Sequence, residues 1–353
     1  MNTTHQTTRA RRGLPKAAAA IGLLAMAASA AQAATWLECE GNKIKWNNNW
    51  TNMYISTTSF PAGSTWDSDL QNAMWHWNNV KGSSFNFYVG RDTDGSHAKD
   101  NGTNEIYLHG TEVGSALAVT FSRYHCYWLF GYQYGRDEAD IAFNSNLGWN
   151  TGKLDYANLG SPYNFELVAL HELGHALGLG HSDGVQATMN SYYANGGPLG
   201  YAKEVDPLPD DRSGVRALYP DGTTETDVAG SPFQRTGSGT SGLVSSPTLA
   251  ARGSTVNIGY TFANLGTSSA TFNLGFYLST NNIISTGDRL LGSNTGAWAS
   301  AGAIGTFTRS LTIPADVAPG TYYLGFLVDK DSGLAEANES NNGQPMPRAI
   351  TVY

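Results

Sequence analysis

The sequence has little charge, few cysteines and no long apolar run, and each shortage excludes a class of protein. Only 14% of its 353 residues are charged, against about 25% in an ordinary soluble domain. Aromatic residues reach 11% and hydrophobic residues 41%, so the chain is not of the highly charged, aromatic-poor type that stays disordered. No apolar stretch approaches the roughly 18 residues of a membrane span. With 29 acidic against 21 basic residues, the chain lacks the positive charge that nucleic-acid binding requires.

The first 33 residues have the pattern of a secretory leader. A basic head of three arginines and one lysine precedes the apolar run Ala17–Ala28, and the small residues Ala31–Ala33 follow. This order predicts export and cleavage after Ala33. The pair Arg11 and Arg12 leaves a twin-arginine route open beside the general one. We therefore expect a secreted, extracellular protein with 17 basic and 29 acidic residues, a net charge of −12.

The two cysteines of the chain, Cys39 and Cys126, both follow the leader. Disulfides persist in the oxidising compartments that exported proteins enter. We therefore expect these cysteines to form one disulfide. A single disulfide in a chain of this length would add stability to a fold that other interactions define.

Composition divides the rest of the chain into two domains. Residues 221–242 are rich in glycine, serine and threonine and lack hydrophobic periodicity, which predicts a flexible linker. Residues 34–220, before the linker, contain both cysteines and every histidine that follows the leader, and residues 243–353 contain neither residue type. The chemistry is therefore expected in the first domain.

Residues 243–353 alternate apolar and polar side chains in short runs separated by turn residues. This pattern predicts an antiparallel β-sandwich. The expected strands are Thr255–Phe262, Thr271–Leu278, Gly305–Ile313, Gly320–Val328 and Ala349–Val352.

Two stretches of this second domain, Tyr277–Ser293 and Asp329–Asn342, resemble the bacterial CARDB domain, an immunoglobulin-like sandwich related to cell adhesion. The resemblance implies a spacer or binding role, with a cell-surface or polysaccharide ligand as the expected partner. Its acidic residues Asp329, Asp331 and Glu339 leave two interpretations open, a calcium site or an ordinary solvated turn.

The first domain mixes both kinds of secondary structure. Helices are expected at Thr65–Val80, Asn164–Leu177 and Pro209–Leu218, the first from its apolar residues at helical spacing. Strands are expected at Ile44–Ser56, Ser84–Val89, Asn104–His109, Ala116–Phe121 and Glu138–Asn144. The sum is a mixed sheet with a few long helices.

Eleven residues, HELGHALGLGH, carry the chemistry of the chain. His171 and His175 are four residues apart, so a helix places them one above the other on one face. Gly178 can take the left-handed conformation that ends a helix, and the chain can then return with His181. Three imidazoles that leave a fourth position open are typical of catalytic zinc sites, whereas structural zinc sites are usually closed by four protein ligands. Glu172 follows the first histidine, where its carboxylate can reach a water activated by zinc.

The same stretch is the signature of the metzincin peptidases, and Met189, eight residues after His181, stands where that clan has its Met-turn. Within the clan the chain resembles the matrixins. Ser182 matches the residue that matrixins have after the third histidine, and Ala139–Trp149 and Leu208–Pro220 resemble their last strand and closing helix. The resemblance covers residues 36–220.

The resemblance implies an α+β zincin fold for the first domain, with a mixed five-stranded sheet and three helices. Gly114–Phe121 would be the antiparallel edge strand that pairs with an extended peptide. The substrate-binding residues implied in this way are Ala116, Leu117 and Ala118 on that strand and Tyr192 and Tyr193 beyond the Met-turn. Cys39 could also act as a thiol that blocks the zinc, which is the alternative to its disulfide.

The remaining histidines and one acidic loop allow weaker expectations. His76, His97, His109 and His125 share no ligand spacing and are expected to be structural. Gly90–Glu105 gathers four acidic residues among glycines, so a second metal, calcium, stays open there beside an ordinary polar loop. The acidic residues are Asp92, Asp94, Asp100 and Glu105.

Together these features predict a secreted, monomeric zinc endopeptidase that hydrolyses proteins or peptides, with Glu172 as general base and then general acid. The alternative is an extracellular adhesion protein with a vestigial protease domain. The intact motif favours the first hypothesis, and the second domain motivates the other.

Overall fold

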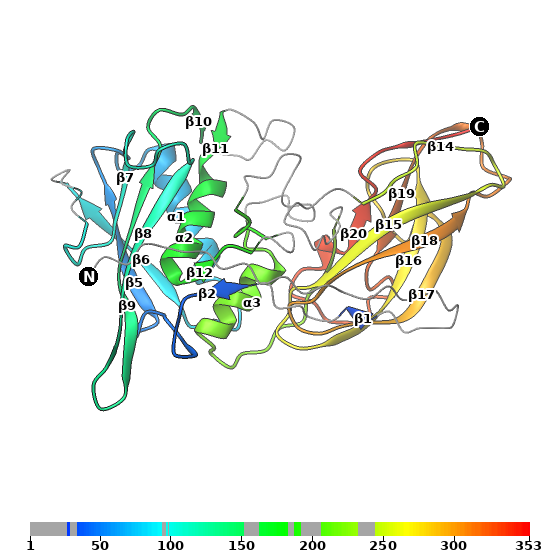
Figure 1. The fold of residues 1–353 in the computed structure, drawn as a ribbon. Coiled ribbons are helices and arrows are strands. Elements are labelled where there is room, and N and C mark those ends of the chain that lie inside the picture. Colours follow the sequence, from blue (N-terminus) through cyan, green and yellow to red (C-terminus); the bar gives the residue numbers. More distant parts are fainter. Residues whose placement is uncertain are drawn as a thin grey trace.

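The computed structural model describes residues 27–28, 34–93, 97, 99–151, 162–182, 187–191, 206–231 and 244–353. Two separate hydrophobic cores divide this part of the chain, one built from residues 46–219 and one from residues 228–352. Figure 1 shows the helices gathered in the first domain and a β-sandwich in the second. None of the described helices is long and apolar enough to cross a membrane.

A mixed five-stranded sheet forms one layer of the first domain, with strand order β6-β5-β7-β9-β8. Four strands run parallel, and β8 at the edge is antiparallel to β9. The strands are β5 (Trp50–Ser56), β6 (Asn86–Asp92), β7 (Glu105–Leu108), β8 (Ala118–Trp128) and β9 (Tyr132–Phe143). Short pairs flank the sheet: β2 (Thr35–Trp36) with β12 (Leu179–Gly180), β3 (Glu38–Cys39) with β4 (Asn42–Lys43), and β10 (Trp149–Asn150) with β11 (Tyr163–Asn164).

Three helices lie where the sequence predicts them: α1 (Thr65–Asn78), α2 (Phe165–Leu177) and α3 (Pro209–Leu218). Helix α1 begins at Ser64, whose side chain accepts a hydrogen bond from the amide of Asp67. Nearly every side chain of α2 is buried, so this helix runs through the core. The indole of Trp77 on α1 donates to the carbonyl of Leu170 on α2 at 2.9 Å, which sets the two helices against each other.

Several expected strand boundaries in this domain were wrong, and the largest differences concern β5, β8 and β9. Strand β5 begins at Trp50 and not at Ile44. Strand β8 runs on to Trp128, and β9 begins already at Tyr132. The long hairpin was missed because its outer half is largely exposed and therefore lacks the alternation of apolar and polar residues that marks a half-buried strand.

The second domain has a three-stranded sheet with order β13-β15-β18 and a larger sheet with order β17-β16-β19-β21-β14, in which β20 also pairs with β19; β1, from the predicted leader, pairs with β17 at the edge of the larger sheet. The strands are β1 (Ala27–Ala28), β13 (Val228–Ser231), β14 (Leu249–Ala250), β15 (Thr255–Asn264), β16 (Ala270–Ser279), β17 (Arg289–Ala299), β18 (Ile304–Thr312), β19 (Gly320–Leu327), β20 (Gly343–Pro345) and β21 (Ile350–Val352), with a short 3₁₀ helix at Glu339–Asn341. Strand β17 was not expected, because glycine, serine and asparagine interrupt its pattern.

The prediction of a flexible linker over residues 221–242 does not hold for residues 228–231, whereas residues 221–227 contain no helix or strand. Residues 228–231 form β13, which pairs with β15 and is buried throughout. The sequence Val-Ala-Gly-Ser has the composition of a linker, but its small uncharged side chains also fit an edge strand of a packed sheet. The second half of the predicted linker lies outside the described residues.

Arg216 on α3 joins the two domains. Its guanidinium donates to the carbonyls of Leu265 and Gly266 at 2.8 and 3.0 Å and contacts Glu225 at 3.0 Å. Burial lowers its pKa to about 10, so it remains charged at neutral pH. An arginine held by three acceptors fixes the closing helix of the first domain against the sandwich.

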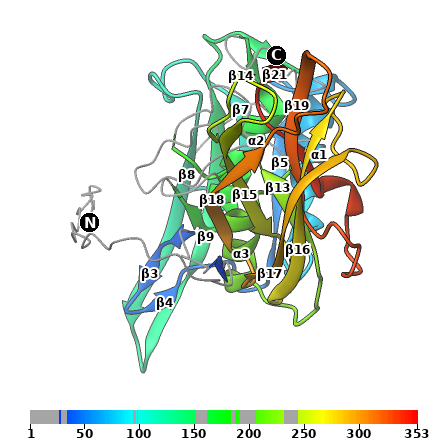
Figure 2. The same ribbon diagram turned by 90° about the vertical axis from the view of Figure 1, so that its right-hand side faces the viewer.

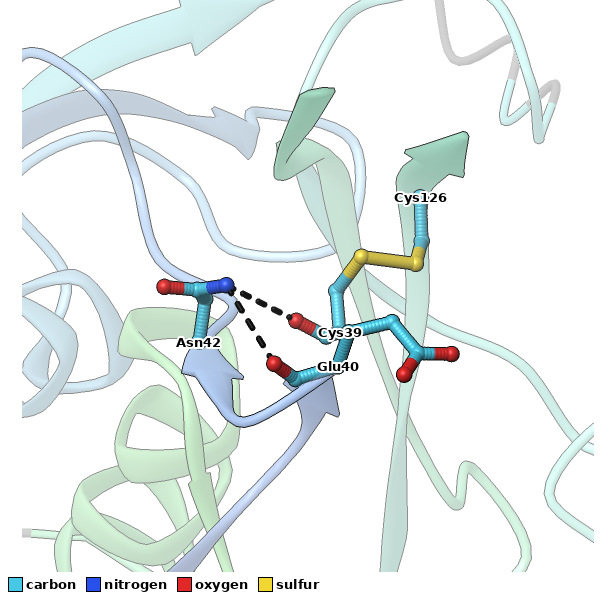
Figure 3. Close-up of a disulfide and its surroundings, with 4 residues drawn as sticks. All are labelled: Cys39, Glu40, Asn42 and Cys126. Carbon is cyan, nitrogen blue, oxygen red and sulfur yellow. Dashed lines mark hydrogen bonds between the residues drawn. A yellow bond between two sulfur atoms is a disulfide. The ribbon is translucent and has the colours of Figure 1, made fainter. Parts of the chain in front are cut away.

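Cys39 and Cys126 form a disulfide, with an S–S distance of 2.05 Å (Figure 3). This confirms the expected pairing and excludes a free thiol at Cys39. The bond joins β3 to β8 across 87 residues of chain.

Reduction of this disulfide is expected to lower the free energy of unfolding by about 3 kcal/mol, because it releases a long closed loop in the unfolded chain. Chemical denaturation of the protein with and without a reductant measures the loss. The Cys39→Ser/Cys126→Ser double variant should reproduce it and should no longer respond to the reductant. Equal midpoints for oxidised and reduced protein would contradict the prediction.

Candidate active site

Helix α2 and the turn after it bring three histidines to one point. His171 and His175 lie one turn apart on α2, and the helix ends at Gly178, which has the positive φ of 128° that the sequence predicts. Strand β12 then pairs with β2 and returns the chain toward the helix, where His181 follows. One nitrogen of each imidazole lies within 4.8 Å of those of the other two.

Backbone contacts orient two of the three imidazoles in a way that suits a metal ion. The Nδ1 atoms of His171 and His175 lie 2.7 and 2.8 Å from backbone carbonyl oxygens. Each ring therefore donates through Nδ1–H and turns the lone pair of Nε2 toward the shared point. The Nε2 atoms of His175 and His181 are 3.1 Å apart, near the roughly 3.3 Å that two ligands of a tetrahedral zinc ion show with bonds of about 2.05 Å.

The protonation state of His175 also suits a metal. Burial lowers the pKa of His175 well below its usual range, and the neighbouring His171 lowers it further. A neutral imidazole is the form that binds zinc. The donor set, the orientation of His171 and His175 and the neutral form of His175 therefore fit a zinc ion.

Glu172 lies beside the three histidines and is buried, although it is a charged residue. The hydroxyl of Thr120 on β8 donates to its Oε2 atom at 2.6 Å. Burial raises the pKa of Glu172 to about 7, and the hydrogen bond from Thr120 opposes part of that shift. Such a carboxyl group can both accept and return a proton near neutral pH. Thr120 was not predicted, because it belongs to an edge strand 52 residues away in the sequence.

Met189 packs beneath the site, against α2. A Cβ atom added to Gly174 would overlap its sulfur and would come within 3.1 Å of the ring of Trp77. Glycine at the fourth position of the HELGH stretch therefore makes room for the methionine. This places Met189 where the resemblance to a Met-turn implies.

The segment that contains Met189 is held by Asp211 on α3. The Asp211 carboxylate accepts hydrogen bonds from the amides of Thr188 at 2.7 Å, Met189 at 3.0 Å and Leu208 at 2.9 Å. Burial and the neighbouring Asp210 raise the pKa of Asp211 to about 7, while the three amides oppose that shift. The carbonyl of Thr188 in turn accepts from His171. Asp211 was not predicted from the sequence; an acidic side chain three residues after the N-cap of a predicted helix is the signal that could have found it.

A cleft of about 840 Å³ runs past the three histidines. It contains Ala116, Leu117 and Ala118, the residues expected to contact substrate on the edge strand. The lining also includes the N-terminal residues Thr35 and Trp36, which the sequence did not suggest. Tyr192 and Tyr193 lie outside the described residues.

The other histidines each have local partners in the structure. His76 lies 3.4 Å from Asp206, and His125 lies 2.7 Å from Asp137. Nδ1 of His109 accepts from a backbone amide. His97 stacks on Tyr107 with ring centroids 4.1 Å apart.

The acidic residues of the loop at 90–105 do not all lie together in the described part of the structure. Asp92, His97 and Glu105 each place one possible ligand atom within 4.8 Å of the other two. Asp100 points outward near Arg123 at 3.8 Å, and Asp94 lies outside the described residues. The expected set of four carboxylates therefore does not converge among the described residues, and calcium binding in this loop stays a prediction.

In the second domain, the acidic residues considered as calcium ligands form hydrogen bonds and ion pairs with nearby residues. Asp329 accepts from the amides of Gly333 and Leu334. Asp331 pairs with Lys330 and Asn273, and Glu339 accepts from the amide of Glu336. Calcium binding there also stays a prediction.

Comparison with known proteins identifies both domains. Residues 45–220 match the matrixin family model, and residues 242–345 match the CARDB model. Matrix metalloproteinase-19 of Mus musculus is 40% identical over 86 residues, which cover 24% of this chain and 14% of that protein. Human matrilysin is 38% identical over 80 residues, 23% of this chain and 26% of that protein. The chain thus spans about a quarter or less of the length of these relatives.

Among solved structures, the second domain is similar to the CARDB domain of the PF1109 protein from Pyrococcus furiosus, which was crystallised in complex with di-metal ions. The identity is 15%, the TM-score is 0.26, and the match covers 36% of this chain and 90% of that one.

Proposed function

Because the chain contains a matrixin domain followed by a CARDB domain, we propose that it is a secreted zinc-dependent endopeptidase. The observation that carries this proposal is the convergence of three imidazole nitrogens beside the buried carboxyl group of Glu172 in an open cleft. His171, His175 and His181 would hold the zinc ion. When bound there, zinc lowers the pKa of water and polarises the carbonyl group of a peptide bond.

The protein's own groups supply the proton transfers. Glu172, with its pKa of about 7, accepts a proton from the attacking water and returns it to the leaving amine. Thr120 holds the Oε2 atom of Glu172, so the carboxyl group keeps one orientation during both transfers. The raised pKa brings the proton affinity of the carboxyl group near neutral pH, where transfer in both directions is efficient.

The edge strand β8 supplies the surface for a peptide substrate. It ends the order of the five-stranded sheet, and its first residues line the cleft. An extended peptide that pairs with this edge would present successive side chains alternately to the cleft and to solvent. Protein or peptide substrates in extended conformation are therefore the proposed class.

We further propose that export removes residues 1–33, which makes Ala34 the N-terminus. In the structure the backbone nitrogen of Ala34 lies 3.1 Å from Oδ1 of Asp210 on α3. Oδ2 of Asp210 accepts from the hydroxyl of Ser182, directly after the third histidine. Cleavage at this bond would convert the amide donor of Ala34 into an ammonium group, which can form an ion pair with the Asp210 carboxylate.

The protein that starts at Ala34 is therefore expected to be about 1 kcal/mol more stable than one that retains Ala33, because an ammonium–carboxylate ion pair replaces an amide–carboxylate hydrogen bond. Thermal unfolding of the two proteins measures the difference. The Asp210→Asn substitution should largely remove it, since the amide has no charge to pair with the ammonium. Equal melting temperatures of the two starting forms would contradict the proposed terminus.

The proposed function is tested by incubating the mature protein, loaded with zinc, with denatured protein substrates and mapping the products by mass spectrometry. We expect endoproteolytic fragments that disappear with a chelator and reappear when zinc is restored. The Glu172→Ala variant should bind zinc but should produce no fragments. Fragments of equal yield from the Glu172→Ala variant, or none from the wild type, would refute the proposal.

The CARDB domain motivates a second candidate, in which the protein mainly binds a cell-surface or polysaccharide ligand. Both roles can occur in one chain, with the sandwich holding the protease near its substrate. An inactive full-length protein that nevertheless binds cell walls or polysaccharide would favour the adhesion role alone.

A further inference from the structure

The outer halves of β8 and β9 form a two-stranded ribbon, residues 122–137, which we call the arm. Figures 1 and 2 show it projecting from the first domain. Its large hydrophobic side chains include six that are between 41% and 100% exposed: Tyr124, Tyr127, Trp128, Leu129, Phe130 and Tyr132. Apolar side chains gathered on a projecting element mark an interaction surface in a soluble protein.

The turn at the tip of the arm presents an aromatic residue at a conformational cost. Phe130 has a φ of +51° and is 100% exposed. A positive φ disfavours a bulky side chain, and a fully exposed ring gains nothing from packing. Neither backbone conformation nor packing in the core therefore explains why phenylalanine occupies this position. Contact with another molecule is the explanation that remains.

The arm is built to hold its shape. After one register shift between Arg123 and Tyr124, its strands stay in register out to the pair Trp128 and Tyr132, whose ring centroids are 5.2 Å apart. The disulfide from Cys126 to the buried Cys39 anchors the arm to the N-terminal segment, as Figure 3 shows. A surface that is ordered before binding loses less conformational entropy when it binds.

The two faces of the arm differ in their relation to the cleft. Tyr124 and Arg136 pair across the ribbon and both line the cleft. Since side chains alternate along a strand, Trp128 and its partner Tyr132 lie on this same face. Tyr127 lies on the opposite face. The exposed aromatic pair at the tip therefore lies on the same face of the ribbon as Tyr124 and Arg136, and Cys126, which stands between the two pairs on this face, is bonded to Cys39.

The number of residues between Thr120 and Trp128 gives the distance from the active site to the tip of the arm. Thr120, which holds Glu172, precedes Trp128 by eight residues, roughly 26 Å in an extended strand. A peptide that extends along β8 from the active site would reach the tip about eight residues from the bond to be cleaved.

The charge of the arm favours a polypeptide over a membrane. Residues 124–135 contain no aspartate, glutamate, lysine or arginine, and the mature chain has a net charge of −12. Peripheral membrane anchors usually combine exposed aromatic residues with lysine and arginine that pair with lipid phosphates, and the tip has neither cation.

We propose that the face formed by Trp128 and Tyr132 is a second substrate-binding site, which takes an apolar segment of an extended polypeptide about eight residues from the cleaved bond. This inference rests on the proposed peptidase function and adds a substrate class to it: long, extended chains that carry an apolar segment at that distance. Short peptides would use the cleft alone.

The test compares one short peptide that fills only the cleft with the same peptide extended at either end by a spacer and an apolar segment. In the Trp128→Ser/Tyr132→Ser variant we expect KM for one of the extended peptides to rise about tenfold, as loss of aromatic anchors typically causes. The kinetics on the short peptide should change by less than about twofold. The matched control is Tyr127→Ser, which removes an exposed aromatic side chain from the other face and should leave KM for both peptides near the wild-type value.

Binding of the same labelled peptides to the Glu172→Gln protein, followed by fluorescence anisotropy, separates this inference from the proposed function. Tighter binding of an extended peptide that is lost with Trp128→Ser/Tyr132→Ser supports the site whether or not the wild type cleaves. Equal KM values for the variant and the wild type, equal losses on short and long peptides, or an equal effect of Tyr127→Ser would overturn it. Sedimentation of the wild type with zwitterionic vesicles, abolished by the double substitution while peptide affinity is unchanged, would assign the arm to a membrane and also overturn it.

Discussion

Replacing Glu172 with glutamine is expected to lower kcat/KM for peptide cleavage by a factor of about 10³, since one general base and acid typically contributes 10²–10⁴-fold. Glutamine has nearly the same shape, and its carbonyl oxygen can still accept the hydrogen bond from Thr120 that the structure shows at 2.6 Å. It cannot accept a proton from water at neutral pH. The loss should therefore lie in kcat, with KM nearly unchanged, and initial rates on a fluorogenic peptide measure it.

Two controls separate chemistry from structure in this experiment. Zinc content, measured by mass spectrometry, should stay at one ion per chain, because the three histidines are untouched. Glu166→Gln makes the same change on the same helix, near His76 and outside the residues that line the cleft, and should keep nearly full activity. A Glu172→Gln protein that retains more than a tenth of wild-type activity would remove Glu172 from the proton transfers.

The parts of the site that the sequence predicted are those defined by local spacing. A helix fixes the relation of His171 to His175, and a glycine that ends the helix follows directly, with a φ of 128°. The spacing of the two histidines and the end of the helix both lie within one short stretch of sequence, so periodicity and residue type were sufficient to predict them. The three helices followed from the same kind of information.

Thr120, Asp210 and Asp211 were not predicted because their roles depend on contacts between distant segments. Thr120 reaches Glu172 across 52 residues, and Asp210 reaches Ala34 across 176. Nothing in the residues around Thr120 and Asp210 distinguishes them from ordinary polar side chains, and the position of Asp211 after a helix N-cap does not reveal its contact with the segment of Met189. Only the packing of β8, α3 and the N-terminal segment around α2 brings these residues to the site.

The arm and β13 show the opposite failure, in which local composition suggested the wrong structure. The arm is exposed over much of its length, so it has no polar alternation to identify it as a strand. Strand β13 has the small residues of a linker, yet all four are buried against the sandwich. In both cases contacts with distant parts of the chain determine that the segment forms a strand, and local composition does not reveal those contacts.

Replacing Asp211 with alanine is expected to lower the free energy of unfolding by about 4 kcal/mol, because it leaves the amides of Thr188, Met189 and Leu208 without their acceptor in a buried place. Each such amide costs roughly 1–3 kcal/mol. Urea denaturation monitored by tryptophan fluorescence measures the change. Asp221→Ala, an exposed aspartate just beyond α3, is the control and should change stability by less than about 0.5 kcal/mol.

The same substitution is expected to weaken zinc binding about tenfold or more, although Asp211 touches no zinc ligand. It holds the amide of Thr188, whose carbonyl fixes Nδ1 of His171 at 2.7 Å, and loss of such outer contacts typically costs 10–100-fold in metal affinity. Competition with a chelator measures the affinity under conditions where the variant is still folded. Unchanged affinity in a destabilised protein would show that Asp211 supports the fold alone, whereas a joint loss would show that the Met-turn segment transmits the position of α3 to the first zinc ligand.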